Sequence, residues 1–299
     1  MTPLFTDAMA LRRVREVSAD GQRPANRPVA GAVFEAELNR HWTIGPKVHG
    51  GAMLALCANA ARTALAGTLG DDAGGEAPGG AGQLGTVEPV AVSGSFLWAP
   101  DPGPMRLATS IRKRGRRISV VDVELYQGGR TAVHAVITLG EPEHRARPLL
   151  SVNPVVELMA PEPPADVAPI GPGHPMAGLV HLAEGCDVRP LVSTLEPTDG
   201  RPPLIQMWVR PRDAPPDVLF ALMCGDVSAP VSFAVSRTGW APTVQLTAYL
   251  RGLPADGWLR VLCTCTQIGQ DWFDEDAIVV DADGRIIVQS RQLALVPDH

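Results

Sequence analysis

Three polar side chains stand out in the second half of the 299-residue chain because each interrupts an otherwise apolar or strand-like pattern. Asp226 is the acid inside the run VLFALMCGDVSAPVSF, Thr243 begins the alternating run TVQLTAYLR, and Gln292 lies in SRQLALV. A carboxylate can take up a proton, while a hydroxyl and an amide can each donate and accept hydrogen bonds. Side chains of these types can together hold a water molecule and activate it for hydrolysis.

Each of these residues also has an ordinary structural explanation. Asp226 could cap the bend before Pro230 or pair with an arginine, because a buried charge needs a partner. Thr243 is a common residue type in a strand, and Gln292 could face solvent. Whether the three side chains meet depends on the elements that carry them.

Two segments are predicted to form buried helices. Residues 52–65, AMLALCANAARTAL, are almost all small or apolar. Residues 217–233 are similar, although Pro230 should end or bend that second helix. A helix that is apolar on nearly every side needs cover all round, so we expect a sheet to wrap it.

Runs with the period-two alternation of a β-strand accompany both helices. In the first half we predict strands over residues 33–38, 90–98, 105–112, 119–126 and 131–139. In the second half we predict strands over residues 204–210, 243–251, 258–267, 277–280 and 285–296. The order strand, helix, antiparallel strands therefore occurs twice.

An alignment of the two halves supports an internal duplication. Placing Pro89 on Pro242 aligns two strands of the same pattern, and the later turns also superpose. The first-half counterparts of Asp226, Thr243 and Gln292 are then Asn59 (or Ala58), Val90 and Ile137. These counterparts cannot together remove a proton and hold water, so we predict one site, in the second half.

The duplication predicts the domain organisation. We expect a first repeat over residues 1–142 and a second over residues 181–299. Between them, residues 143–180 form a Pro-rich linker, because proline lacks an amide donor and resists both helix and sheet. Residues 67–85 are a glycine-rich run that we interpret as a flexible insertion in the first repeat.

An antiparallel sheet wrapped around one apolar helix is the hot-dog fold, and two copies can join edges into one sheet. The entry His49-Gly50-Gly51 to the first helix resembles the hot-dog thioesterases. The second half resembles the C-terminal repeat of type II acyl-CoA thioesterases, and the resemblance covers nearly the whole chain outside the linker. It implies an α+β double hot-dog fold with two tandem repeats, each an antiparallel sheet around a central helix. It also implies an acyl-CoA thioesterase of lipid metabolism, which cleaves an acyl thioester to free acid and CoA.

The resemblance assigns roles to individual residues. Type II acyl-CoA thioesterases use an Asp on the second-repeat helix, a Thr on the following strand and a Gln on the last strand, which match Asp226, Thr243 and Gln292. Asp226 would then act as the base, while the other two hold the attacking water. We expect the backbone amides of Gly51 and Ala52, at a helix start, to stabilise the thioester oxygen.

Two further groups are candidates for substrate binding. His49, Gly50 and Gly51 are expected to shape the helix entrance or line the pocket, and no GxSxG motif supports His49 as part of a triad. Arg112, Arg114, Arg116 and Arg117 fall in a predicted hairpin turn. That turn is either a solvated cationic loop or a site for the phosphates of CoA.

The amino-acid composition limits the kinds of ligand and partner that we expect. A formal net charge of -6 gives no long-range attraction for nucleic acid or an anionic membrane, so neither is expected. Five cysteines without a CxxC pair and seven scattered histidines predict no metal site, and CoA is part of the substrate, so no bound cofactor is expected. The sequence shows neither a signal peptide nor an 18-residue apolar run, which predicts a cytoplasmic location. A homodimer is left open.

Two other functions remain as alternatives. The duplicated fold could serve as a non-catalytic module that binds acyl-CoA or an acyl-carrier protein. An enoyl-thioester hydratase would need an Asp and a His in one helix region, and residues 217–233 contain no His.

Overall fold

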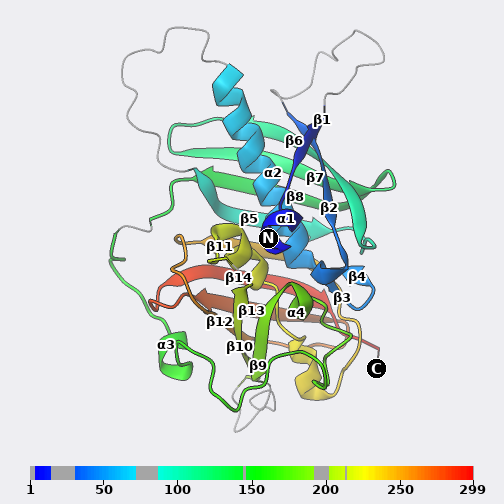
Figure 1. The fold of residues 1–299 in the computed structure, drawn as a ribbon, viewed down its shortest axis with the longest axis vertical. Helices are drawn as coiled ribbons and strands as arrows, with labels where there is room; N and C mark the ends of the chain where they lie inside the picture. Colours follow the sequence, from blue (N-terminus) through cyan, green and yellow to red (C-terminus); the bar gives the residue numbers. More distant parts are fainter. Residues whose placement is uncertain are drawn as a thin grey trace.

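The alternating runs form strands of one antiparallel sheet (Figure 1). The computed structural model describes residues 4–14, 31–71, 87–143, 146–191, 202–212 and 214–298. The first-half strands are β1 (Arg12–Val14), β2 (Val33–Leu38), β5 (Glu88–Phe96), β6 (Gly103–Lys113), β7 (Ile118–Gln127) and β8 (Arg130–Gly140). The second-half strands are β9 (Cys186–Leu191), β10 (Leu204–Pro211), β11 (Thr243–Leu250), β12 (Leu259–Thr264), β13 (Trp272–Val280) and β14 (Ile286–Leu295). A separate small ribbon contains β3 (Thr43–Ile44) and β4 (Lys47–Val48).

The order of strands is the same in both halves when each is read toward the middle. Over the described residues the sheet has 12 strands in the order β1-β2-β6-β7-β8-β5-β11-β14-β13-β12-β10-β9. The run β2-β6-β7-β8-β5 is thus matched by β10-β12-β13-β14-β11. In the middle, β5 pairs antiparallel with β11, from Ala91 opposite Tyr249 to Ser95 opposite Gln245. This pairing removes the two inner edges that would otherwise be exposed.

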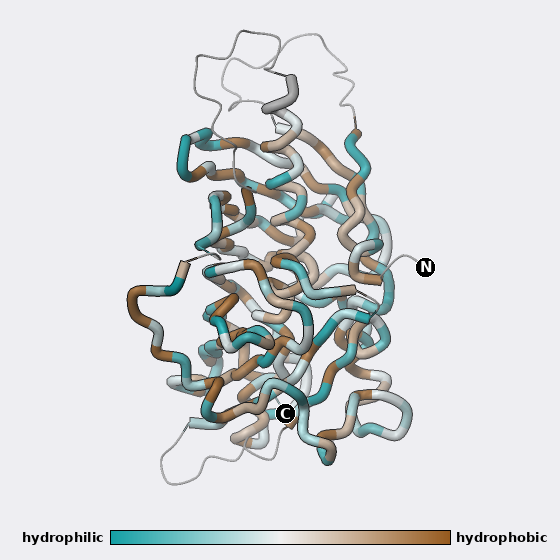
Figure 2. Tube along the Cα trace, turned by 60° about the vertical axis from the view of Figure 1, so that its left-hand side comes forward, coloured by the Kyte–Doolittle hydropathy of each residue, from teal (hydrophilic) through white to brown (hydrophobic). Residues whose placement is uncertain are grey.

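Hydrophobic and hydrophilic residues alternate along strands of the sheet (Figure 2). In β7, for example, Val121, Val123 and Leu125 are fully buried, while the residues between them are only partly covered. Because successive side chains on a strand point to opposite faces, one face can bury a core while the other meets solvent. The two longer α-helices of the described chain lie against the buried face (Figure 1).

The first of these helices is longer than predicted. Helix α2 (Gly50–Asp71) contains the predicted residues 52–65 and extends into residues 67–71 of the glycine-rich run, while residues 72–85 of that run lie outside the described ranges. Helix α2 packs against β5, β6, β7 and β8, and also against the helix of the second half. The expectation of an apolar helix under a sheet is confirmed for this half.

The second helix is shorter than predicted. Helix α5 (Val218–Cys224) begins after Asp217, whose side chain accepts a hydrogen bond of 2.7 Å from the Phe220 amide, and ends at a Gly225 cap. The predicted continuation to residue 233 is wrong. Pro230 has an extended ψ of 130° and starts a separate 3-10 turn, η3 (Val231–Val235). Asp226 therefore lies in the loop after α5 rather than on the helix.

Part of the proline-rich segment covers the outer face of the second half. It carries the short helix α3 (Val155–Leu158), and Val155, Met159 and Val167 form a second apolar cluster with Trp208 and Trp258. The Trp208 ring nitrogen donates to the Ala160 carbonyl at 2.8 Å. Helix α4 (Leu182–Gly185) and β9 follow, and neither was predicted.

The sheet register corrects the internal alignment by one residue. Val92 pairs with Ile137 in the first half as Leu246 pairs with Gln292 in the second. Both strands then carry a bulge at the same place, and Pro89, rather than Val90, stands where Thr243 stands. The predicted alignment was off by one residue because it placed Pro89 on Pro242, whereas the matched bulges place Pro89 on Thr243.

Other expectations from composition can be compared with the described residues. All five cysteines are free and buried. In the described part of the chain, no helix is long and apolar enough to cross a membrane.

Candidate active site

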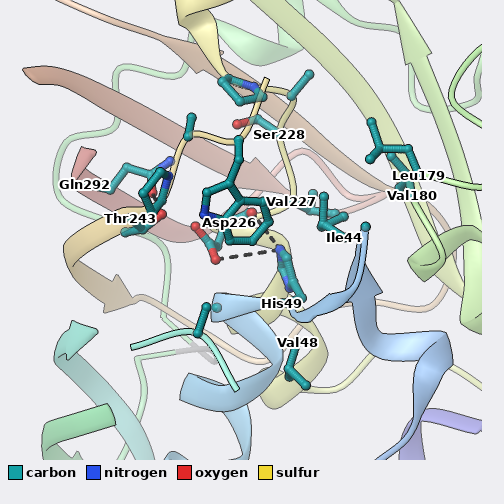
Figure 3. Close-up of a pocket in the computed structure, with 18 of the residues that line it drawn as sticks. Ile44, Val48, His49, Leu179, Val180, Asp226, Val227, Ser228, Thr243 and Gln292 are labelled. Atoms are coloured by element: carbon teal, nitrogen blue, oxygen red, sulfur yellow. Dashed lines mark hydrogen bonds and ion pairs between the residues drawn. The ribbon is translucent and has the colours of Figure 1, made fainter. Parts of the chain in front are cut away.

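A largely apolar cavity of about 540 Å³ lies between the two halves (Figure 3). Its polar side chains, apart from indoles, are His49, Asp226, Ser228, Thr243 and Gln292. The remaining wall is mostly apolar and comes from three parts of the chain. Met53 and Phe96 belong to the first half, Met207 and Phe273 to the second, and Met176 to the proline-rich segment. All three predicted catalytic residues therefore line one cavity.

Asp226 lies where the loop after α5 meets the start of α2. Only 7% of its side chain is exposed, and its carboxylate accepts a hydrogen bond from the Gly51 backbone amide. Burial raises the pKa of Asp226 to about 7, although the Gly51 hydrogen bond acts in the opposite direction. A carboxyl group with this pKa is poised to exchange a proton near neutral pH, as a general base must.

His49 holds the loop that carries Asp226. Its Nε2–H donates to the main-chain carbonyl of Asp226 at 2.8 Å, and its Nδ1 accepts from the Ala52 amide at 3.3 Å. Burial lowers the pKa of His49 to about 4, so the ring is neutral near pH 7. The approach of 3.6 Å between Nε2 and Asp226 Oδ2 is therefore not an ion pair. Both ring nitrogens form hydrogen bonds within the protein, so His49 stabilises the start of α2 and the loop that carries Asp226.

The two glycines allow this close approach. A Cβ atom on Gly50 would lie 2.7 Å from Asp226 Oδ2, and one on Gly51 would lie 2.6 Å from the Met223 carbonyl oxygen. A larger residue at Gly51 would have to displace the end of α5, and one at Gly50 would push the side chain of Asp226 or Phe96. The Gly-Gly pair thus explains how α2 can reach the Asp226 carboxylate.

The amides predicted to form the oxyanion site have partners within the protein. The Gly51 amide donates to Asp226 and the Ala52 amide donates to His49, and a role of either amide toward a thioester oxygen stays a prediction. The helix start does supply backbone donors, but it uses them to position protein groups.

Thr243 and Gln292 lie side by side on neighbouring strands (Figure 3). The Thr243 hydroxyl donates to Gln292 Oε1 at 2.6 Å. In a regular strand Thr243 would share the outward face of Gln245, which is exposed, but the bulge between them turns Thr243 into the cavity. The β-bulge in β11 therefore brings the Thr243 hydroxyl to the Gln292 side-chain amide.

Glu275 is a buried acid next to the cavity that the sequence prediction missed. It is 3% exposed and accepts hydrogen bonds from Gln292 Nε2 at 3.2 Å, from the Val231 amide at 3.1 Å and from the Ser228 hydroxyl. Burial raises its pKa to about 7, and the nearby charge of Asp226 adds to the rise. Its position in phase with the buried residues Phe273 and Ala277 is a signal that the sequence does contain.

The basic turn lies away from this cavity. It joins β6 to β7, where Ile118 pairs with Gly140, and Gly140 pairs in turn with Glu88 at the start of β5. The cavity contacts β5 at Phe96, eight residues further along. At about 3.3 Å per residue, Glu88 and Phe96 at the opposite ends of β5 are roughly 26 Å apart. The structure thus does not bring Arg112, Arg114, Arg116 or Arg117 to the cavity, and a phosphate site there stays a prediction.

Within the described residues of the first half, the corresponding positions carry no equivalent polar cluster. Asn59 donates to the Met9 carbonyl at 2.7 Å and accepts from Arg62 at 2.8 Å, so its amide is engaged elsewhere. Pro89 and Ile137 occupy the positions of Thr243 and Gln292. In the described part of the chain, His, Cys, Asp and Glu side chains also form no group of three that could hold a metal ion.

The chain is similar over its whole length to known proteins. Proteins of Mycobacterium tuberculosis and Mycobacterium bovis, both described as uncharacterized, are 69% identical over 310 residues, covering 99% of each chain. An acyl-CoA thioesterase II, TesB2, from Mycobacterium marinum has a TM-score of 0.63 at 16% identity, covering 98% of this chain and 96% of the other. A protein of unknown function with a hot-dog fold from Alicyclobacillus acidocaldarius has a TM-score of 0.71 at 18% identity over 100% of both chains. The two structures show that the fold is of the hot-dog type.

The family is shown by two domain matches. Residues 38–140 match the acyl-CoA thioesterase N-terminal domain, and residues 160–296 match the acyl-CoA thioesterase C-terminal domain. Together they span most of the chain, including β3 to β8 and β9 to β14. The chain therefore belongs to the acyl-CoA thioesterase family.

Proposed function

We propose that this protein hydrolyses an acyl-CoA thioester to a free acid and CoA. One observation carries the proposal: a buried carboxyl group with a pKa near 7 and a hydrogen-bonded Thr243–Gln292 pair line the same apolar cavity. Membership of the acyl-CoA thioesterase family supports this reaction class.

The hydrogen-bond directions suit one bound water molecule. The Thr243 hydroxyl uses its proton on Gln292, so its oxygen can accept a hydrogen bond from water. Gln292 uses one Nε2 hydrogen on Glu275, and its second hydrogen can donate to water. Asp226 can accept the remaining water proton. This leaves a lone pair of the water oxygen for the thioester carbon.

In the proposed reaction, Asp226 takes a proton from the water as the new C–O bond forms. The C–S bond then breaks, and the proton held by Asp226 is available to the departing thiolate of CoA. Holding water and thioester together in a dry cavity supplies much of the rate advantage, because the reacting atoms are oriented before reaction. CoA enters as part of the substrate, so the proposal requires no bound cofactor.

The apolar wall is suited to the acyl tail. A cavity of about 540 Å³ is in the range of sites that enclose small ligands, which are typically about 300–1,000 Å³. Met176 and Leu179 of the proline-rich segment face Met207 and Phe273 of the second half around this space. We infer that this segment helps to select acyl groups as well as joining two domains.

We also infer that the fold is a double hot dog, with repeats over residues 1–142 and 181–299 joined by residues 143–180. The matching strand orders and the shared bulge support a duplication. The duplication leaves one site, because the polar set belongs to the second repeat. The first repeat contributes the start of α2, which positions Asp226.

A hydrolysis assay over acyl-CoA chain lengths tests the proposal. Free thiol and free acid should appear in equal amounts, with a rate that depends on acyl length. Tight binding of acyl-CoA without turnover of any chain length would instead favour a binding module and contradict the proposed hydrolase.

A further inference from the structure

Glu275 occupies a position in β13 that the fold would fill with an apolar residue. Phe273, Ala277 and Val279 share its face of the strand, and all are buried. A carboxylate at this depth is costly unless it is well hydrogen-bonded. Glu275 accepts three hydrogen bonds, and one comes from the side chain of Gln292, which lines the cavity.

The contact between Glu275 and Gln292 decides how the Gln292 amide is turned. A side-chain amide can be placed in two orientations that exchange its oxygen and its nitrogen. An ionised Glu275 can only accept hydrogen bonds, so the Gln292 nitrogen must face it at 3.2 Å. The Gln292 oxygen then faces Thr243, which donates to it at 2.6 Å. The opposite orientation would set two oxygens against each other.

We propose that Glu275 is a positioning residue for the hydrolysis proposed above: it fixes the Gln292 amide so that an N–H of Gln292 and the oxygen of Thr243 are turned toward the water site. Glu275 itself does not line the cavity and acts through Gln292. The inference rests on the proposed function, because the water is the nucleophile of that reaction.

Glu275 also holds the loop that carries Asp226. The Ser228 hydroxyl and the Val231 amide both donate to it, and these residues flank Ala229 and Pro230 of the cavity wall. One carboxylate thus ties together the loop after α5, strand β13 and strand β14. A change at Glu275 should therefore alter the positions of both Gln292 and the loop that carries Asp226.

The charge of Glu275 is coupled to Asp226. Two carboxylates that interact in a buried site each raise the pKa of the other. The other titratable groups around Glu275 are Cys263 and Cys265, whose thiol pKa values burial raises, so both stay neutral near pH 7. His49, beyond Asp226, is also neutral. Removal of the Glu275 charge should therefore lower the pKa of the base.

Glu275→Gln is the test variant, because it keeps the size of the side chain. A Gln cannot accept all three hydrogen bonds, because only one of its two terminal atoms is an oxygen. Its amide nitrogen, which is a donor, would then face the donor group of either Gln292 or Val231. We expect kcat to fall about 10–100-fold, the effect of losing a hydrogen bond to a charged group, with a smaller change in KM because Glu275 itself does not line the cavity. The acidic limb of the kcat/KM profile should move to lower pH.

Glu88→Gln is the matched control. Glu88 is also a buried acid, 8% exposed, but it pairs with Arg62 at 2.7 Å and does not line the cavity. This variant loses a buried carboxylate away from the water site, so its kcat and its acidic limb should match the wild type. A Glu275→Gln variant that behaves like the control would overturn the inference.

A double-mutant cycle tests whether Glu275 acts through Gln292. In a Gln292→Ala background, Glu275→Gln should lower kcat much less than it does in the wild type. Equal losses in both backgrounds would overturn the positioning role. If Glu275→Gln does not fold, Glu275→Asp replaces it in both experiments, because the shorter carboxylate withdraws from Gln292. A folded Glu275→Asp with wild-type kcat would likewise overturn the role.

Comparing Asp226→Asn with Glu275→Gln distinguishes a failure of this inference from a failure of the proposed function. If the wild type cleaves no thioester, or if Asp226→Asn keeps full activity, the proposed hydrolytic site fails. If Asp226→Asn is inactive while Glu275→Gln keeps the wild-type kcat and pH profile, only the role of Glu275 fails.

Discussion

The Gly51 amide in the first turn of α2 donates a hydrogen bond to the carboxylate of Asp226, which follows α5 in the other half of the chain. His49, just before α2, holds the same residue through its main-chain carbonyl at 2.8 Å. The start of one helix thus positions an acid of the other half. The candidate site therefore depends on both halves, although its polar side chains are mostly from the second.

Thr243→Val should lower kcat about tenfold, because the hydroxyl that faces Gln292 at 2.6 Å is lost while the side-chain shape is nearly kept. Thr247→Val is the control on the same strand, since the Thr247 hydroxyl contacts Ser93 at 3.1 Å instead of the cavity. Steady-state hydrolysis of the best acyl-CoA substrate measures both. Equal kcat values for the two variants would argue against a role of Thr243 in holding water.

Hydrolysis should lose activity as the pH falls below about 7. The pKa of Asp226 is raised to about 7 by burial, and the base works only when ionised. Because Glu275 is coupled to it, the acidic limb should report the pair rather than one residue. A profile of kcat/KM between pH 5 and pH 9, on the order of two units on either side of this value, measures the limb. A flat profile down to pH 5 would exclude Asp226 as the base.

Gly51→Ala should destabilise the protein by about 1–3 kcal/mol. The new Cβ atom would lie 2.6 Å from the Met223 carbonyl oxygen, a main-chain atom that moves only if α5 moves. Gly171→Ala is the control, because a Cβ there meets nothing within 4 Å. Urea unfolding compares the two variants. Unchanged stability of Gly51→Ala would mean that the two helices are less closely packed at this point.

Much of the sheet could be predicted from the sequence because its strands alternate clearly. β13 was predicted only in part, since the prediction began at residue 277 and the strand begins at Trp272. The acids Asp274 and Asp276 suggest a turn in the sequence, but in the sheet they face Arg291 of β14, with Asp276 at 2.6 Å. This error hid Glu275 between them. Cross-strand ion pairs cannot be seen before the strands are placed.

The candidate site was predictable in its residue types and not in its local geometry. Asp226, Thr243 and Gln292 do line one cavity, yet the bulge that turns Thr243 inward has no plain mark in the sequence. The cavity wall contributed by Met176 was missed because a proline-rich segment was interpreted as a linker only. Chain segments of low regularity gain their structure from tertiary contacts, which alternation along the sequence does not report.

Protonation of Asp226 should stabilise the fold. Its pKa is raised from the ordinary value of 3.8 to about 7, so between these values the folded protein binds more protons than the unfolded chain. Stability therefore falls as the pH rises through this window. Asp226→Asn removes the buried charge, so its Tm should exceed that of the wild type at a pH above the window, and the gain should shrink as the pH approaches 3.8. A lower Tm of the variant above the window would contradict this account.

The central claim is that Asp226 is the base of a thioester hydrolysis, and the rate of Asp226→Asn tests it most directly. The control is Asp217→Asn, because Asn caps a helix about as well as Asp and Asp217 lies outside the cavity. With the best acyl-CoA substrate, kcat of Asp226→Asn should fall by about 100-fold or more, while Asp217→Asn keeps the wild-type value. Wild-type turnover by a folded Asp226→Asn protein would contradict the account.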